Sequence, residues 1–108
     1  QIAAGLLIEA ERNVDSLLKE VPGEWEPYAL KGVLLDHAEK YRAAQVAYGR
    51  ALSLSPNNIA VLNNMSLSLA QEGQLGAAIR LLEDLVRSEY STAQLRQNLA
   101  LFYQSIDL

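Results

Sequence analysis

The chain has 108 residues, half of them hydrophobic and a fifth charged, which is enough apolar material for one packed domain. The absence of cysteine excludes disulfides and thiolate metal sites, and a formal net charge of −4 with scattered Lys and Arg argues against a nucleic-acid partner. No apolar run approaches the roughly 20 residues that span a bilayer, so no transmembrane segment is predicted.

Hydrophobic residues recur with helical spacing along the chain, and no segment keeps the period-two pattern of a strand. Pro22 and Pro56 each close a helical stretch, and Glu26-Pro27 places a proline in the first turn of another. The pattern predicts six helices, in chain order over residues 2–20, 25–38, 41–54, 59–72, 75–88 and 92–105.

The later helices carry local boundary signals. Asn57-Asn58 offers an N-cap before Ile59, and Gly73-Gln74 separates the fourth and fifth helices. The run from Ser91 to Gln94 has the spacing of a capping box, in which the first and fourth side chains satisfy backbone donors reciprocally. These signals predict where the last three helices begin.

The helical stretches belong to a repeat of 34 residues, the distance between Pro22 and Pro56. A helix–turn–helix unit of this length is the tetratricopeptide (TPR) period. Registering the chain on that period aligns small, aromatic and aliphatic residues in columns: Ala10, Ala44 and Ala78; Val14, Tyr48 and Leu82; Leu17, Ala51 and Leu85; Leu35, Leu69 and Tyr103; and Gly5, Glu39 and Gly73.

We therefore expect an all-α fold, a TPR superhelix (α-solenoid) of antiparallel helix pairs with about six helices, forming a single domain over 1–108. Its parts are a partial repeat over 1–24, repeats over 25–58 and 59–92, and the first helix of a further repeat over 93–108. The residues that mark the pattern are Gly32, Ala44, Tyr48, Ala51, Pro56, Gly73 and Ala78, while Ser66 and Tyr90 stand where the second unit has Gly32 and Pro56.

Helix packing explains the pattern. Gly32 and Ala44 have little or no side chain, so the two helices of a unit can approach closely, and Tyr48 and Leu52 are expected to fill the space between neighbouring units. Helices of about 14 residues are marginal alone in water, so stacking supplies the stability.

No catalytic or cofactor chemistry is predicted. His37 is the only histidine, and without a cysteine or a second histidine it is expected to be a polar residue near a helix end, not a general base or metal ligand. No nucleophile elbow surrounds the serines, and the glycines are too far apart to form a phosphate loop. We expect a protein that is not an enzyme and that needs no cofactor or metal.

A protein or peptide partner is expected on the concave face, which the first helix of each TPR unit lines. Side-chain amides both donate and accept hydrogen bonds, so they can hold the backbone of an extended peptide. The alternative is that the same amides cap loops or bond the neighbouring helix, and the residues leave both open. The candidate peptide-binding residues are Asn63, Asn64, Leu67, Gln71, Gln97, Asn98 and Leu101.

The clamp with which some TPR co-chaperones grip a C-terminal carboxylate is not expected. That clamp needs lysines beside the asparagines, and Ala29 and Ala60 stand where a cation would be useful.

Three stretches, 41–48 (YRAAQVAY), 61–70 (VLNNMSLSLA) and 95–101 (LRQNLAL), resemble the TadD family, the TPR proteins of the bacterial tight-adherence (Flp pilus) assembly system. The resemblance covers roughly residues 25–108, and Ser66 departs from the glycine that the family often has. It implies a lipoprotein-type scaffold in the periplasm, associated with the outer membrane, that helps to assemble the secretin machinery of pilus export.

Other interpretations of the chain stay open. A cytoplasmic TPR regulatory or chaperone-type module that binds short peptides is the alternative function. Because the chain starts at Gln1 and ends at Leu108 within a helical pattern, we expect an excerpt of a longer protein, whose signal or anchor the sequence does not include. The ends of the solenoid would then expose apolar faces, such as those of Leu99 and Phe102, through which copies can associate.

Overall fold

The computed structural model describes residues 3–106. It contains six helices and, within that range, no strand: α1 (Ala4–Glu20), α2 (Trp25–His37), α3 (Tyr41–Leu54), α4 (Ile59–Gln71), α5 (Leu75–Arg87) and α6 (Ala93–Ile106). The all-α solenoid predicted from the sequence is confirmed. The expected first residue of the first helix, residue 2, and the last two residues of the final unit lie outside the described residues.

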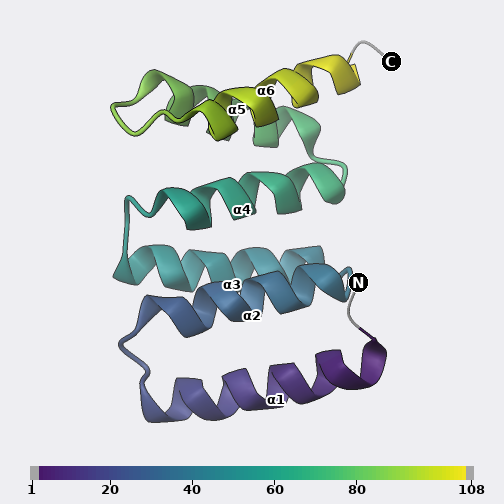
Figure 1. Ribbon diagram of the computed structural model, residues 1–108, viewed down its shortest axis with the longest axis vertical. Coiled ribbons are helices and arrows are strands. Elements are labelled where there is room, and N and C mark those ends of the chain that lie inside the picture. Colours follow the sequence, from purple (N-terminus) through teal and green to yellow (C-terminus); the bar gives the residue numbers. More distant parts are fainter. Residues whose placement is uncertain (1–2, 107–108) are drawn as a thin grey trace.

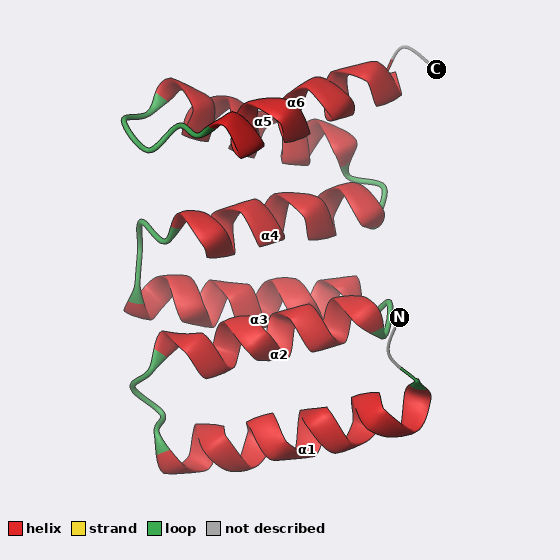
Figure 2. Ribbon diagram, viewed as in Figure 1, coloured by secondary structure: helices red, strands yellow, loops and turns green. Residues whose placement is uncertain are grey.

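The helices stack one above another along the longest axis of the molecule (Figures 1 and 2). The extents along the three principal axes are 41, 29 and 20 Å. Each helix packs against its neighbours in the chain, and α2 also contacts α4. In the view of Figure 1, α3 and α5 lie behind α2, α4 and α6. The first helices of successive units therefore share one face of the solenoid.

Asn58 and Thr92 cap the helices that follow them. The Oδ1 atom of Asn58 accepts a hydrogen bond from the Val61 N–H at 3.2 Å, as predicted. The Thr92 Oγ1 atom accepts from the Leu95 N–H at 3.2 Å. The capping box predicted for Ser91 and Gln94 is wrong, because α6 begins at Ala93 and Thr92 therefore occupies the cap position.

Glu39 and Gly73 occupy equivalent positions in the turns after α2 and α4, and both have positive φ angles, of 60° and 95°. The aligned Gly5 lies inside α1 instead, so this column marks a turn only in the second and third units. A non-glycine residue pays a steric cost for this backbone conformation. The backbone at Glu39 is therefore strained, whereas the equivalent Gly73 adopts a positive φ angle without this steric cost.

The repeat columns form much of the buried core. Ala44, Ala51, Ala78 and Leu82 are fully buried, and Tyr48 is almost so. The ring of Tyr48 lies against Gly32 of its own unit. Tyr48 also belongs to a buried cluster with Val61 of the next unit, so its ring packs within the pair and takes part in the contact between units.

Two residues expected on an exposed end of the solenoid are buried instead. Leu99 and Phe102 each retain only 8% exposure, because both pack in a core cluster with Leu82 and Leu85 of α5. The apolar side chains that α6 exposes are Leu101, Tyr103 and Ile106. The sequence-based choice of Leu99 and Phe102 as an association face was therefore wrong.

Candidate functional site

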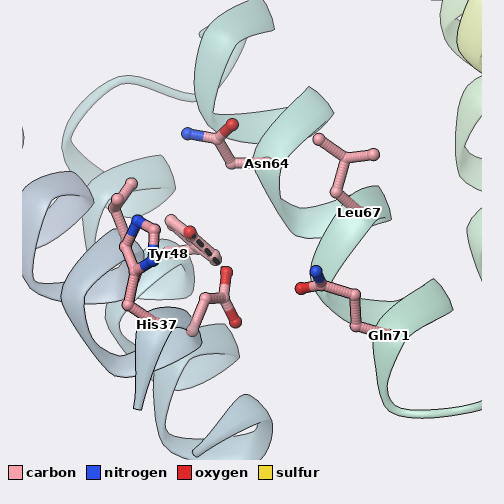
Figure 3. A pocket seen from close by; sticks show the side chains of 7 residues that line it. His37, Tyr48, Asn64, Leu67 and Gln71 are labelled. Carbon is pink, nitrogen blue, oxygen red and sulfur yellow. Dashed lines mark hydrogen bonds between the residues drawn. The ribbon is translucent and has the colours of Figure 1, made fainter. Parts of the chain in front are cut away.

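A cleft of about 190 Å³ opens between α2 and α4 on the face that these helices share. Figure 3 shows His37 projecting into it from α2, with Asn64, Leu67 and Gln71 facing it from α4. Its lining residues are Val33, Asp36, His37, Tyr48, Asn64, Leu67 and Gln71.

Helical spacing explains why these residues meet. Val33, Asp36 and His37 follow the i, i+3, i+4 spacing of one helix face, and Asn64, Leu67 and Gln71 follow i, i+3, i+7. Because α2 and α4 are first helices of successive units, their equivalent faces turn to the same side.

A second cleft, of about 490 Å³, lies between α4 and α6, and it continues the first one. Leu67 and Gln71 line both clefts, and Phe102 and Ser105 of α6 bound the second. The two clefts form one groove across α2, α4 and α6, which we call the concave groove. Leu101 and Gln97 are exposed on α6 but line neither cleft.

The candidate asparagines fall into two groups. Asn98 is buried, and its Nδ2 donates to Asn63 Oδ1 at 2.9 Å, while its Oδ1 accepts from Gln94 Nε2 at 3.0 Å. Asn63 and Asn98 therefore join α4 to α6, which is the alternative that the sequence left open for them. This leaves neither of these amides facing the cleft of Figure 3.

Asn64 is the amide that faces the cleft. It is the repeat equivalent of Asn98, but the position equivalent to Asn63 in the preceding unit holds Ala29. Ala29 has no polar side chain to receive the amide, and the Asn64 side chain makes no hydrogen bond within residues 3–106. Its donor and acceptor are thus available to a molecule in the groove.

Asp36 stands at the edge of the cleft and joins two units. Its Oδ2 accepts a hydrogen bond from the Tyr48 hydroxyl, and its Oδ1 accepts from the hydroxyl of Ser68, both at 2.7 Å. Burial, followed by the bond to Asp36, raises the pKa of Tyr48 far above its ordinary value of 10.0. The tyrosine therefore stays a neutral donor to the carboxylate.

A polar chain continues from Ser68 to the surface. Gln45 donates to Ser68 Oγ at 3.3 Å and to Glu72 Oε1 at 3.2 Å, and Arg42 donates to Glu72 Oε2 at 2.6 Å. The Arg42 bond, together with those from Gln45 and Gln74, lowers the pKa of Glu72. These hydrogen bonds hold the start of α3 against the end of α4.

Sequence reasoning missed both Asp36 and Ser68. Asp36 offers no sequence signal of its own, since it is an acid in the last turn of α2. Ser68 offered a signal, since the equivalent positions in the neighbouring units hold Leu34 and Phe102, both buried. A serine in a buried apolar column indicates a polar partner inside the protein.

The described residues contain neither a candidate metal site nor a membrane-spanning helix. Within residues 3–106 no group of three or more His, Cys, Asp or Glu side chains is placed to hold a metal ion. None of the six helices is both long enough and apolar enough to span a bilayer.

Comparison with known proteins supports the repeat class. No family model matches the chain. It is 40% identical over 63 residues to a TPR repeat-containing thioredoxin, TTL4, from Arabidopsis thaliana, a match over 58% of this chain and 9% of that protein. It is 36% identical over 66 residues to an uncharacterised protein, y4yS, from Sinorhizobium fredii (strain NBRC 101917 / NGR234), over 61% of this chain and 36% of the relative.

The chain thus spans well under half the length of either relative. With the 34-residue period and the stacked helix pairs, the first match supports a TPR-type protein that interacts with other proteins.

Proposed function

We propose that this TPR-type chain is a non-catalytic interaction scaffold that holds an extended segment of a partner protein in the concave groove. The observation that carries the proposal is Asn64, an amide that has no hydrogen-bond partner within residues 3–106 and is directed into a cleft. Such an amide accepts from a peptide N–H and donates to a peptide carbonyl.

The groove also offers apolar contact. Leu67 is partly exposed at the junction of the two clefts, and Val33 faces it from α2. Hydrophobic walls with a few placed polar groups are the usual composition of a ligand-binding pocket. Gln71 extends the amide contacts toward α6 because it lines both clefts.

We further propose that the scaffold serves assembly of the Flp (tight-adherence) pilus secretion machinery, in the periplasm at the outer membrane. The support is the resemblance of residues 41–48, 61–70 and 95–101 to the TadD family. Pilus secretion components are then the partners. Copies of the chain also associate end to end in this proposal, through the exposed apolar residues of α1 and α6: Leu6, Ile8, Leu17, Leu101, Tyr103 and Ile106.

The alternative is a cytoplasmic TPR regulatory or chaperone-type module that binds short peptides. The match to a plant TPR repeat-containing thioredoxin supports the TPR module that this alternative shares with the first proposal. The concave groove would be used in the same way, with a different partner.

Site-specific cross-linking in the native host tests the proposal. A photo-reactive amino acid replaces Leu67 in the full-length protein, and the same residue replaces the exposed Asp84 of α5 as a control. We expect a partner cross-linked at position 67 and not at 84, identified by mass spectrometry as a component of pilus secretion. Equal cross-linking at both positions would show that the groove is not the binding site. A cytoplasmic partner would favour the alternative function.

A further inference from the structure

Asp36 is a partly buried carboxylate that forms no ion pair among the described residues. Within residues 3–106 the ion pairs are Lys31 with Asp15, Arg42 with Glu72, and Arg87 with Asp84, so none of them includes Asp36. The donors it has are the neutral hydroxyls of Tyr48 and Ser68. Carboxylates away from bulk water are normally paired, so this one lacks its usual partner.

The carboxylate retains capacity for a ligand. A carboxylate has two oxygens and about four lone-pair sites, of which the two hydroxyls occupy one on each oxygen. Asp36 lines the cleft between α2 and α4, together with the amide side chains of Asn64 and Gln71. One negative charge and two amide oxygens therefore border the same space.

The remaining walls of the cleft suit an aliphatic stem. Val33, Leu67 and the ring of Tyr48 are apolar, and the cleft volume of about 190 Å³ exceeds the roughly 150 Å³ of a cavity that accommodates benzene. Long cationic side chains bury their methylenes against apolar surface while the charged end reaches a polar group. The cleft has the shape and polarity for one such side chain.

The other two helices of the groove place few charged side chains near Asp36 that could repel or replace a cationic ligand. Helix α4 contains no charged residue, and α6 contains one, Arg96, whose guanidinium donates to Ser91. His37 lies on the rim of the cleft. The formal net charge of the chain, −4, adds a weak attraction for cations.

We infer that the cleft between α2 and α4 binds a lysine side chain of the partner segment, its ammonium on Asp36 and its stem between Val33 and Leu67. This specificity rests on the proposed function, because it supplies the chemistry of the segment that the groove holds. An ammonium needs single acceptors from several directions, which Asp36, Asn64 and Gln71 offer, whereas a guanidinium fork needs two parallel free acceptors.

Titration of the chain with three matched peptides tests the inference. The probes are acetylated and amidated six-residue peptides of sequence Ala-Ala-Leu-X-Ala-Ala, in which X is lysine, its uncharged isostere norleucine, or glutamate. Side-chain amide NMR signals of Asn64 and Gln71 report binding. We expect the lysine peptide to bind about tenfold more tightly than the norleucine peptide, and this preference to shrink as ionic strength rises from about 0.05 to about 0.5 M.

Charge variants in the cleft sharpen the test. Asp36→Asn is expected to abolish the preference for lysine over norleucine, and Asn64→Lys to abolish binding of the lysine peptide. Since Asp36→Asn also disturbs two internal hydrogen bonds, Asn64→Asp provides an independent check, and it should tighten the lysine peptide several-fold. Asp84→Asn on α5, an exposed position away from the groove, is the matched control and should change nothing.

The outcomes separate this inference from the proposed function. Equal binding of the lysine and norleucine peptides would overturn the lysine site while leaving the groove as a peptide-binding surface. If none of the three peptides shifts the Asn64 and Gln71 signals, the lysine site is overturned as well. The proposed function is then decided separately by the cross-linking at position 67. Unchanged lysine preference in both Asp36→Asn and Asn64→Asp would exclude Asp36 as the acceptor.

Discussion

The ring of Tyr48 lies directly on the backbone of Gly32, and a Cβ atom at position 32 would stand only 2.4 Å from Cε1 of the tyrosine. The equivalent positions of the next unit hold Ser66 and Leu82, both fully buried. A glycine thus accompanies the larger aromatic ring, and a serine accompanies the smaller leucine. Gly32 and Tyr48 share one volume between α2 and α3, so a larger residue at position 32 requires a smaller one at position 48.

Gly32→Ala should destabilise the chain although alanine is the better helix former. The added methyl group forces the ring of Tyr48 out of its position and disturbs the hydroxyl that donates to Asp36, so we expect a loss of about 1–3 kcal/mol. Urea unfolding followed by circular dichroism measures it. The double variant Gly32→Ala, Tyr48→Leu should lose less stability than the sum of the two single variants, because the smaller leucine leaves room for the methyl group. If the two losses in unfolding free energy simply add, the two positions do not share one volume.

Glu39→Gly should stabilise the chain. Glu39 has a φ of 60°, which costs a non-glycine residue roughly 1–2 kcal/mol, and the greater freedom of glycine in the unfolded chain offsets part of the gain. We expect a net gain of about 0.5–1 kcal/mol. The matched control is Gly73→Ala in the equivalent turn, which should lose a similar amount. A thermal midpoint that moves in the same direction for both variants would refute this account.

Asn98→Ala and Asn64→Ala should have different effects although the two residues are repeat equivalents. Removing the Asn98 side chain leaves the side-chain oxygen of Asn63, Oδ1, without the donor that joins α4 to α6. We expect the free energy of unfolding to fall by about 1–3 kcal/mol. Asn64 bonds nothing within the described chain, so its loss should change stability by less than about 0.5 kcal/mol while weakening partner binding. Chemical denaturation and the peptide titration together check this, and equal destabilisation by both variants would contradict it.

Tyr48 should give the chain a distinct alkaline response. Its pKa is raised in the folded state, so above about pH 10 the unfolded chain loses this proton and the folded chain keeps it. Stability is therefore fully present below pH 10 and falls as the pH rises above that value. Tyr48→Phe should be less stable at neutral pH but lose less stability between about pH 9.5 and 11.5. Thermal midpoints against pH for both proteins measure the difference, and parallel curves would be inconsistent with the shift.

End-to-end association should depend on α1 and α6. Leu6 is 62% exposed on α1 and Ile106 is 58% exposed on α6, so Leu6→Glu or Ile106→Glu should prevent association while leaving helicity unchanged. Sedimentation velocity over a range of concentrations measures it. The matched control is Leu99→Val, a conservative change in a buried residue, which should not alter the association state. Identical sedimentation of all the variants and the unaltered chain would end the proposal.

Much of the fold follows from local sequence. The apolar periodicity placed α3 at its observed bounds, 41–54, and Asn58 was identifiable as a cap because an amide before an apolar helical run satisfies a free N–H. The 34-residue period then ordered the helices, since each unit can bury its apolar face only against the next one. Within the groove, the same period put His37, Asn64 and Gln71 on one face.

The pairing of polar side chains between helices depended on the tertiary structure. Asp36 and Ser68 lie 32 residues apart and are not repeat equivalents, so the buried serine indicated a polar partner but the period did not identify it as Asp36. Asn63, Asn64 and Asn98 are alike in sequence, yet packing joins Asn98 to Asn63 and leaves Asn64 facing the cleft, because Ala29 offers the latter no partner. Repeat period and capping are properties of neighbouring residues, whereas the availability of a polar group is decided by which side chain the stacked helix brings against it.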